Sequence, residues 1–511
     1  MSLSKQQNKC RKIHVGRVKE ENLNLNRTKE EESTIPALPR MFGYNEGRKE
    51  EKEVNKEKIN KISILDSNKS KCTTLVPKNI KRIMPETYVQ KIIKSENIIC
   101  LNNKLYIYDK ALGYYRGLSK HQAKVMIKDK LKKKDKIYLV KYDIDSIYSL
   151  LMIEPKIQFE SGDIKTNSYL INCKDCVIDL QNNRIREHSP KDLFFNCINA
   201  SYNSDIDKDY KGKHFYKFLN SITQGNDELK KLLQEVTGYA ISNINNAKKL
   251  FILYGVSNSG KSVYLDLLEF LIGYQNISNI PLQKLSDERY SAELFNKVAN
   301  IYNELPDEGI RDLGQIKALV SPNDRVIAKK LYEQPFSFKN KATLIFATNN
   351  LPELKLSLYQ DRKAYYNRLL IIPFMNAIKE KEQDKELINK LEREIDIIFL
   401  WAIKGLVRYI NNGYRFSKCT VSKTILKNYI KQENLFEIYV EENIREDDGR
   451  YLFFDDIKES FTLFMRENDR KFTSKDIKIL KEYISMKFNI EYTRIHRDGK
   501  NKRGFVGISF V

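Results

Sequence analysis

Four short apolar runs in the middle of the chain alternate with polar or helical segments. The first run is Leu250–Tyr254, and Val263–Ile272 after it has the apolar spacing of an amphipathic helix. The other runs are Val298–Tyr302, Ala342–Ala347 and Leu369–Phe374. Short apolar runs bounded by turns are typical of buried strands. This part of the chain is therefore predicted to form an α/β domain.

The pattern changes on the N-terminal side of this domain. From residue 84 to about 190, short apolar runs alternate with turns and with helical segments such as Lys120–Lys132, which indicates a mixed α/β domain. From there to residue 245 the spacing becomes helical, with predicted helices at Phe215–Ile222 and Leu229–Ile241. The strands predicted in the first of these regions are Ile98–Leu101, Leu105–Tyr108, Ile137–Val140, Tyr169–Ile171 and Cys176–Leu180.

The two ends of the chain differ from the middle. Residues 1–83 are rich in Lys, Glu and Asn and have no sustained apolar stripe, so we expect a flexible charged arm. Residues 436–511 are predicted to form a small separate domain. The expected domains are the arm 1–83, the α/β domain with its helical linker 84–245, the central domain 246–435 and the C-terminal domain 436–511.

Composition narrows the class of partner. The formal net charge is +23, which favours nucleic acid or an anionic membrane as a partner. An AT-rich genome, which favours Lys, Ile and Asn codons, is an alternative source of this positive charge. No run reaches the roughly 20 apolar residues of a membrane span, and the N-terminus lacks the apolar core of a secretory signal. We therefore expect no membrane partner and a cytoplasmic location, in the cytosol of a bacterial host. Scattered cysteines suit a reducing compartment, and Cys173 and Cys176 are expected to be buried thiols.

Residues 255–262 read Gly-Val-Ser-Asn-Ser-Gly-Lys-Ser and connect the first strand to the first helix. They match the P-loop pattern G-x-x-x-x-G-K-[ST] in its strand–loop–helix context. Backbone N–H groups would face the phosphates, Lys261 would contact the β/γ-phosphates, and the Ser262 hydroxyl would bind Mg²⁺. The motif therefore predicts ATP and Mg²⁺ as ligands. The predicted nucleotide-binding residues are Gly255, Val256, Ser257, Asn258, Ser259, Gly260, Lys261 and Ser262.

Two later strands end in residues that suit ATP hydrolysis. Asn303 and Glu304 follow Val298–Tyr302, and we expect Glu304 to lie at the tip of a strand beside the P-loop strand. There it would polarise the attacking water and help to hold Mg²⁺. Asn349 follows the third strand, where its amide would sense the γ-phosphate or the lytic water. An ordinary surface glutamate and a simple Asn-Asn-Leu-Pro turn are the alternatives.

Basic residues flank the third and fourth strands. Lys329 and Lys330 lie in a predicted hairpin that would contact nucleic-acid phosphates, and a solvated lysine pair is the alternative. Arg368 comes directly before the fourth strand. It is the candidate for an arginine that reaches the γ-phosphate of a neighbouring subunit, with Arg362 as the second choice.

The C-terminal domain is predicted to contain a helix followed by a basic hairpin. A capping box at Thr473–Asp476 begins a helix that extends to about Phe488. Strands at Glu491–His496 and Gly504–Phe510 flank a turn, Arg497–Arg503, with a cationic tip. This order predicts a winged helix that binds duplex DNA, and a winged helix that docks protein is the alternative. The predicted DNA-binding residues of this domain are Lys475, Lys478, Arg497, Lys500, Lys502 and Arg503.

In this order, the motifs resemble those of the superfamily 3 helicases of small viruses, phages and plasmids. They are similar in particular to the helicase part of the phage/plasmid primase family, which is related to the poxvirus primase-helicase. The resemblance covers about residues 90–511 and implies an AAA+-like P-loop ATPase core, an N-terminal helicase-associated domain and a C-terminal winged helix. The segments that carry it, besides the motifs above, are Asn172–Leu180, Leu233–Tyr239, Asp287–Asn303, Lys317–Asp324 and Phe399–Leu406.

The resemblance implies an ATP-dependent DNA helicase or replication initiator of a phage, plasmid or other mobile genetic element. It implies a homo-oligomer, a hexamer, with single-stranded DNA in its channel and a separate primase as a candidate partner. The alternative is an origin-binding protein that uses ATP as an assembly switch. The sequence departs from the family at Asn303, where an acidic residue is common, and at Ser321-Pro322-Asn323, where glycines are usual. Because the arm is short and polar, we expect no priming activity.

Overall fold

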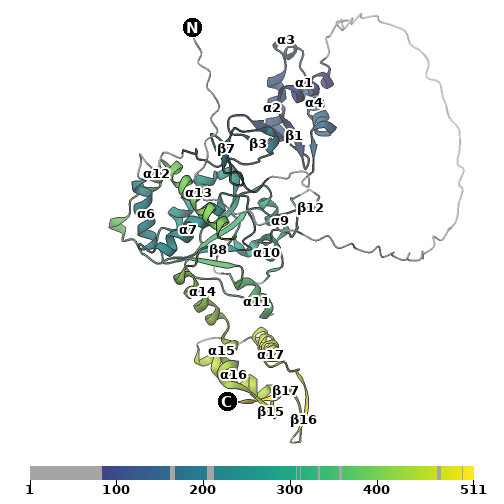
Figure 1. Cartoon of the computed structure of the whole chain (residues 1–511). Helices are drawn as coiled ribbons and strands as arrows, with labels where there is room; N and C mark the ends of the chain where they lie inside the picture. Colours follow the sequence, from purple (N-terminus) through teal and green to yellow (C-terminus); the bar gives the residue numbers. More distant parts are fainter. Residues whose placement is uncertain are drawn as a thin grey trace, which may run out of the picture. The chain divides into compact units, whose positions relative to one another are not determined.

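The structure, a computed structural model, describes most of the chain from residue 83 onward (Figure 1). It is a mixed α/β protein with a parallel sheet, which confirms the predicted fold class at this level. The predicted arm lies outside the described residues except for residue 83. None of the described helices is long and apolar enough to cross a membrane. The described ranges are 83–160, 167–203, 212–306, 308–310, 312–331, 334–355, 359–468, 473–497 and 499–511.

The first described region combines four helices with a four-stranded sheet of order β3-β2-β1-β4. The β1–β2 connection is Asn102-Asn103, and both residues have positive φ (48° and 56°), as a tight two-residue hairpin requires. The helices α1 and α2 both pack against α4. The elements are α1 (Pro85–Ser95), β1 (Ile98–Leu101), β2 (Lys104–Asp109), β3 (Tyr114–Gly117), α2 (Lys120–Lys130), α3 (Lys133–Lys136), α4 (Lys141–Ile153) and β4 (Gln158–Phe159).

The apolar run Ile137–Val140 is not a strand, so this prediction was wrong. α3 ends at Lys136, and the run forms a turn and an extended loop up to α4. Ile137 is 79% exposed and Val140 is 57% exposed, so the run buries little apolar surface. A four-residue apolar run is too short to distinguish a strand from a loop by periodicity, and tertiary pairing decides.

A small antiparallel sheet, β5-β6-β7, follows. Cys173 and Cys176 lie in the turn between its first two strands, with their Sγ atoms 3.4 Å apart. Both are buried free cysteines, as predicted. The strands are β5 (Leu170–Asn172), β6 (Val177–Asp179) and β7 (Arg184–Arg186).

The central sheet has five parallel strands in the order β14-β8-β13-β10-β9. It contains the four predicted strands and adds a short fifth strand, β9. The strand that precedes Glu304 is β10, and β13 separates it from the P-loop strand β8, so the prediction that these two strands are neighbours was wrong. β13 is buried along its whole length, which suits a central position. The strands are β8 (Leu250–Gly255), β9 (Ile277–Ser278), β10 (Ala299–Tyr302), β13 (Thr343–Thr348) and β14 (Leu369–Phe374).

Helices that come before, between and after the strands in the sequence share one hydrophobic core with the central sheet. Buried side chains of α6, α7, α8 and α13 belong to the same cluster as residues of β8, β10 and β13. Two glycines allow α7 and α13 to pack closely, because a Cβ at Gly238 would lie 2.3 Å from the carbonyl oxygen of Ala402 and one at Gly405 would lie 2.2 Å from that of Gln234. The helices are α6 (Lys213–Thr223), α7 (Asp227–Ala240), α8 (Lys261–Ile272), α9 (Glu288–Ser291), α10 (Gly314–Leu319), α11 (Tyr359–Tyr366), α12 (Leu387–Glu392), α13 (Ile395–Asn411) and α14 (Thr420–Glu433).

The predicted basic hairpin is present between β10 and β13. Its strands β11 (Val326–Ala328) and β12 (Phe336–Phe338) pair antiparallel. The rings of Phe336 and Phe338 both contact Phe295, which anchors the base of the hairpin. Lys329 and Lys330 follow directly after β11, beyond the paired residues.

The C-terminal region has its own hydrophobic core and the order helix–strand–helix–helix–strand–strand. The backbone N–H of Thr473 donates to Asp476 at 2.9 Å, which confirms the predicted capping box and helix start. Its strands form a sheet of order β15-β17-β16. The elements are α15 (Leu435–Asn443), β15 (Ile444–Phe453), α16 (Phe454–Glu467), α17 (Ser474–Phe488), β16 (Thr493–Arg497) and β17 (Lys500–Phe510).

The C-terminal hairpin turns more tightly than predicted. Arg497 pairs directly with Lys500, so strand pairing extends into the segment 497–503 that was predicted to be a turn. Lys502 and Arg503 are strand residues opposite Ile495 and Arg494. All four residues of the paired segment Lys500–Arg503 are exposed, and Ile495 is the buried residue of β16 opposite them.

Candidate nucleotide-binding site

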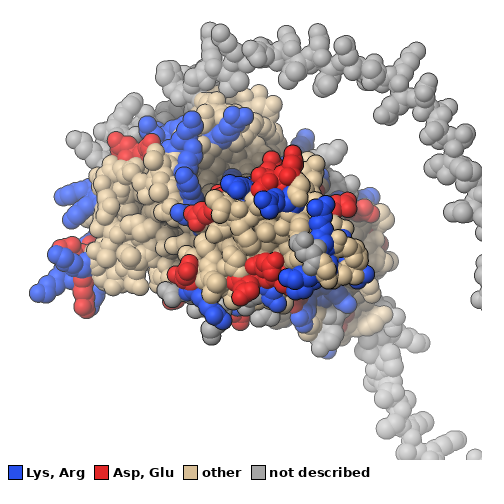
Figure 2. Space-filling model, turned by 90° about the horizontal axis from the view of Figure 1, so that it is seen from below, with Lys and Arg blue, Asp and Glu red and all other residues tan. Residues whose placement is uncertain are grey.

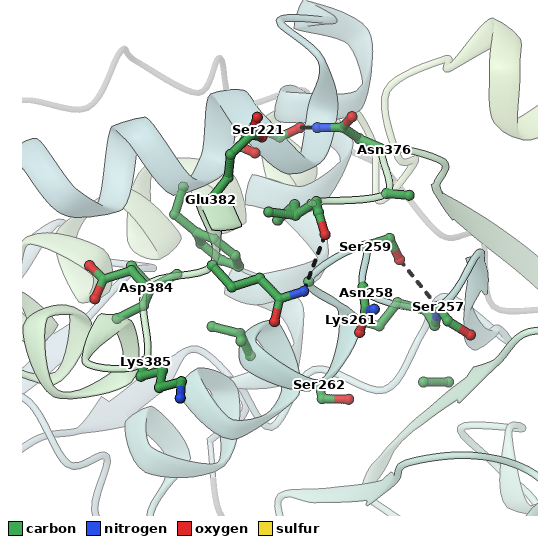
Figure 3. A pocket seen from close by; sticks show the side chains of 18 of the residues that line it. Ser221, Ser257, Asn258, Ser259, Lys261, Ser262, Asn376, Glu382, Asp384 and Lys385 are labelled. Atoms are coloured by element: carbon green, nitrogen blue, oxygen red, sulfur yellow. Dashed lines mark hydrogen bonds between the residues drawn. The ribbon is translucent and has the colours of Figure 1, made fainter. Parts of the chain in front are cut away.

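A cavity of about 930 Å³ opens at the C-terminal edge of the central sheet (Figure 3). It lies where β8 leads into α8, beside the ends of β10 and β13. The P-loop residues 257–262, Glu304 and Asn349 all line it. The fold therefore brings three predicted parts of one site together from three strand ends.

The P-loop backbone is shaped by its glycines. Gly255 pairs with Phe374 of β14, and a Cβ there would lie 1.9 Å from the Phe374 carbonyl oxygen. Gly260 has φ +87°, and Asn258 also has a positive φ of 58°. Ser259 is buried and its hydroxyl donates to the carbonyl of Val256 at 2.7 Å. Such conformations suit a loop whose successive backbone N–H groups would face a phosphate at the start of α8.

Lys261 lies folded over the P-loop backbone. Its Nζ donates to the carbonyl oxygens of Gly255 (2.9 Å) and Val256 (2.6 Å). The side chain is 8% exposed, and this burial lowers the pKa of Lys261, while the charge of Glu304 partly opposes the shift. A partly desolvated ammonium held by neutral carbonyls gains much from an anionic partner. Lys261 is therefore poised to exchange these carbonyls for phosphate oxygens.

Ser262, the predicted Mg²⁺ ligand, is in contact with the residue that departs from the family pattern. The Nδ2 atom of Asn303 donates to Ser262 Oγ at 3.0 Å. Glu304, the next residue, has a φ of 65°. Its charge acts on Lys261 across the cavity mouth. Ser262 and Glu304 offer the hydroxyl and carboxylate oxygens that Mg²⁺ prefers, and Asn303 can contribute an amide oxygen.

Asn349 completes the group of polar residues at the strand ends. It follows β13, the strand between β8 and β10, and its Nδ2 atom donates to Ser257 Oγ at 3.4 Å. A side chain in this position can contact both the P-loop and a ligand bound to it. The location fits the sensing role predicted from the sequence.

Arg368 lies at the opposite end of the strands from the cavity, where the parallel strands begin. It precedes the first residue of β14, which pairs with Leu250, whereas the P-loop begins beside the last residue, Phe374. Six strand residues span roughly 20 Å, so Arg368 does not reach the cavity of its own chain. Its Nη1 atom donates to the carbonyl of Ala364 at 2.8 Å, and its buried Nε has no hydrogen-bond partner among the described residues.

Arg362, the second choice, has a different environment. Its side chain is buried, with Nη1 donating to the carbonyl of Glu433 at 2.7 Å and Nη2 donating to that of Leu354 at 3.2 Å. The first bond ties α11 to the end of α14, and the second ties it to the segment between β13 and α11. Arg362 therefore has a structural role in this conformation, which leaves Arg368 as the candidate that could act on another subunit.

One wall of the cavity was not predicted from the sequence. It comes from α6 and from the segment 376–390 after β14, and Figure 3 shows Glu382, Asp384 and Lys385 of this segment across the cavity from Ser262. The Ile378 N–H donates to the carbonyl of Asn258 at 2.9 Å, so the segment also braces the P-loop. Its polar sequence is indistinguishable from that of a surface loop. The basic residues of this wall are Lys213, His214, Lys217, Lys385 and Lys390.

The predicted DNA-binding residues are distributed over two hairpins and a helix. Lys329, Lys478, Arg497, Lys500 and Arg503 are exposed, and Lys330 is half-buried. Lys502 forms an ion pair with Asp455 at 2.9 Å, which raises the pKa of Lys502. The side chain of Lys475 lies outside the described part of the structure. On the face in Figure 2, Lys and Arg are interspersed with Asp and Glu and do not form one continuous basic patch.

Comparison with known proteins identifies relatives for two parts of the chain. A family model described as "D5 N terminal like" matches residues 67–224, and a family of unknown function (DUF5906) matches residues 253–368. The uncharacterized mitochondrial protein ymf21 of Marchantia polymorpha is 31% identical over 134 residues, which are 24% of this chain and 74% of that protein. The chain belongs to the same family as this mitochondrial protein.

Two viral proteins are more distant relatives. One is named "Putative helicase L207/L206" of Acanthamoeba polyphaga mimivirus and is 26% identical over 240 residues, or 44% of this chain. The other is named "Putative helicase V13" of Sputnik virophage and is 28% identical over 158 residues, or 29% of this chain. The matched regions span 24% and 20% of these viral proteins. Together with the D5 N terminal like match, they support a D5-like primase-helicase family.

Solved structures of the NrS-1 C-terminal region also align with the chain. The apo structure of residues 305–718 of that protein is 13% identical and covers 84% of this chain, with a TM-score of 0.44. A second form is 12% identical, with a TM-score of 0.42. Both alignments cover the whole of the NrS-1 chain.

Proposed function

We propose that this protein is an ATP-dependent DNA helicase or replication initiator of a virus, phage, plasmid or other mobile genetic element. In this proposal, residues 246–435 form an AAA+-like ATPase core of superfamily 3, and residues 436–511 form a winged helix. The observation that carries the proposal is the convergence of Lys261, Glu304 and Asn349 on one cavity at the edge of a parallel sheet.

Each residue of the cavity has a distinct role in the proposed reaction. Lys261 and the P-loop N–H groups would bind the phosphates of ATP, and Ser262 would bind Mg²⁺, which neutralises charge on the phosphates. Glu304 would orient and polarise the attacking water, and Asn349 would sense the γ-phosphate. Their grouping within one cavity supports hydrolysis because the attacking water and the phosphate must be held at the same place.

A homo-oligomer, proposed to be a hexameric ring, would complete the site. Arg368 lies too far from the cavity of its own chain, and it is half-buried, whereas Arg362 is buried. An adjacent subunit that presented its nucleotide beside Arg368 would supply an anionic partner. Arginine is suited to this role because it stabilises charge on a transferring phosphoryl group.

DNA is the proposed substrate of the motor. The order of helices and strands in the C-terminal region supports the proposed winged helix, which would bind duplex DNA through α17 and the β16–β17 hairpin. Lys329 and Lys330 would contact a single strand in the channel. The names of the viral relatives and the D5-like match are consistent with a helicase.

The test is a paired assay of ATP hydrolysis, with and without single-stranded DNA, and of strand separation on a forked duplex. The proposal expects DNA to stimulate hydrolysis and ATP to drive unwinding. Lys261→Ala should reduce both, through weaker ATP binding, while the protein remains folded and keeps its oligomeric state. Stimulated hydrolysis without unwinding would favour an origin-binding protein that uses ATP as an assembly switch. Wild-type protein that neither binds nor hydrolyses ATP would refute the proposal.

A further inference from the structure

We propose that residues 132–142 form a second binding surface, one for single-stranded nucleic acid. These residues read Lys-Lys-Lys-Asp-Lys-Ile-Tyr-Leu-Val-Lys-Tyr and connect α2, through α3, to the start of α4. We call this stretch the Lys/Tyr segment. The inference rests on the proposed function in one respect, namely that a helicase produces single strands to be bound.

The Lys/Tyr segment exposes an unusual concentration of large apolar side chains. Ile137 (79%), Tyr138 (49%), Val140 (57%) and Tyr142 (77%) are all exposed within six positions. No other six-residue stretch of the described chain exposes more than two such side chains. Single exposed apolar residues are ordinary, but a contiguous group marks a surface that binds something.

The charge of the segment indicates an anionic partner. Its five lysines and single aspartate give it a net charge of +4. Lys132, Lys133, Lys134 and Lys141 are exposed, and none of them forms an ion pair with a described residue. These lysines therefore present positive charge to solvent beside the apolar group.

The neighbouring acidic groups are already engaged by other residues. Asp135 accepts a hydrogen bond from the hydroxyl of Tyr88, Asp145 pairs with Lys124, and Asp143 accepts from the backbone N–H of Val140 at 3.1 Å. Glu96 pairs with Lys130 at 2.5 Å. The ion pairs of Asp145 and Glu96 are with Lys124 and Lys130, outside the Lys/Tyr segment, although the charge of Lys141 also acts on Asp145.

Single-stranded nucleic acid is the occupant that uses both features. Lysines bind the phosphates, and exposed tyrosine rings provide faces on which unpaired bases stack. Tyr138 and Tyr142 are four positions apart, on either side of the loop-to-helix junction at Lys141. A duplex would offer the same phosphates but would hide the faces of its bases, so stacking selects the single strand.

The test measures the binding of a fluorescently labelled twenty-nucleotide dT strand to the full-length protein by anisotropy, over a series of salt concentrations. Tyr138→Ala combined with Tyr142→Ala should weaken binding about tenfold or more, because base stacking on each ring is lost. Lys133→Ala combined with Lys134→Ala should reduce the slope of log K against log salt by about 1.4, since each single-strand phosphate contact contributes about 0.7.

Matched controls remove the same groups elsewhere. Tyr274→Ala deletes a tyrosine that is 62% exposed, and Lys427→Ala combined with Lys431→Ala deletes two exposed lysines of α14. Both controls should bind the dT strand as the wild type does. A dT strand that carries 5-iodouracil should crosslink to Tyr138 or Tyr142 in the wild type, which tests contact without a mutation.

Three outcomes would overturn the inference. The first is equal binding of the dT strand by the wild type and the tyrosine variant. The second is that the variants bind the dT strand as the wild type does but no longer sediment with vesicles of phosphatidylserine and phosphatidylcholine. This result would indicate that the segment binds a membrane surface. The third is a change in oligomeric state alone, which would indicate contact with a second copy. ATP hydrolysis without DNA is measured on the wild type and on each variant. If the wild type did not hydrolyse ATP, the proposed function would be refuted, and dT binding by the segment would stand as a separate result.

Discussion

The P-loop cavity and the C-terminal hairpin both contain cations that we propose bind phosphates, but they hold these cations in opposite ways. In the cavity, Lys261 is buried and held by two backbone carbonyls. In the hairpin, Arg503 and Lys500 are exposed strand residues with basic partners across the ladder, Arg494 and Arg497. A buried, positioned cation suits one compact anion, whereas a row of exposed cations suits a long polyanion. The difference predicts large effects of single substitutions in the cavity and small, salt-dependent effects in the hairpin.

The largest effect is expected for Glu304→Gln, which removes the proposed base but keeps the shape of the side chain. The rate of ATP hydrolysis should fall about 10²- to 10⁴-fold, the usual contribution of general base catalysis. ATP binding should persist, because the phosphate contacts of the P-loop remain. The measurement is a single-turnover hydrolysis rate beside an equilibrium binding titration. A variant that hydrolyses ATP at the wild-type rate would exclude Glu304 as the base.

Lys261→Ala should have the next largest effect, on affinity. The loss of charge-assisted hydrogen bonds predicts an ATP affinity about 10- to 100-fold weaker, measured by calorimetry. In the wild type, only the charged form of Lys261 binds phosphate well, and burial lowers its pKa. ATP affinity should therefore decline as the pH rises, starting below the ordinary lysine pKa of about 10.4. Unchanged affinity in the variant would show that the cavity binds another ligand.

Asn303→Asp tests the departure from the family pattern at the metal position. The new carboxylate beside Ser262 should improve Mg²⁺ binding about tenfold, because Mg²⁺ favours carboxylate ligands. It should also weaken ATP binding in EDTA, since it adds a negative charge near the phosphates. Mg²⁺ titrations of the nucleotide-free protein and ATP titrations with and without EDTA measure both changes. Asn350→Asp, which adds the same charge just after Asn349, is the matched control and should leave Mg²⁺ binding unchanged.

Substitutions in the C-terminal hairpin should have a small effect on duplex affinity, and the size of this effect should depend on the salt concentration. Lys500→Ala combined with Arg503→Ala should reduce duplex affinity several-fold and lower the slope of log K against log salt by about 1.8, or 0.9 for each lost phosphate contact. ATP hydrolysis without DNA should not change. If the double variant lost all DNA binding at low salt, the hairpin would contain a positioned site like that of the cavity.

The smallest effect is expected for Asp455→Ala. Lys502 is an exposed residue paired with Asp455, and exposed ion pairs contribute little. Removing the aspartate frees the lysine for phosphate, so duplex affinity should rise by about twofold. The same anisotropy titration measures it. A fall in affinity would show that Asp455 positions Lys502 for DNA contact.

The sequence predicted the residues of the cavity best where a local motif determines the backbone. The P-loop and the four strands of the sheet are local patterns, and the structure has them where the spacing placed them. The order of the strands is a tertiary property, which is why the position of β13 between β8 and β10 was missed. The wall formed by α6 and residues 376–390 was missed for the same reason, because it comes together only when distant segments fold onto the P-loop.

The wrong predictions for two surface segments have a different cause. Lysines border the exposed apolar loop Ile137–Val140 on both sides, and the extended C-terminal hairpin mixes apolar and basic residues. In such mixtures the alternation of side chains does not indicate how many residues pair, since pairing depends on the partner strand. Ile137 has no partner strand, whereas Lys502 and Arg503 do.

The close packing of α7 against α13 determines which fragment of this protein could be purified in a folded form. Gly238 and Gly405 leave no space between the two helices, and the buried carboxylate of Glu235 accepts hydrogen bonds from both the backbone N–H and the hydroxyl of Ser417. A fragment that began at residue 246 would lack α7, together with the α6 wall of the cavity, and would expose the apolar face of α13 to water. A fragment intended for nucleotide binding should therefore begin before α6 and extend through α14.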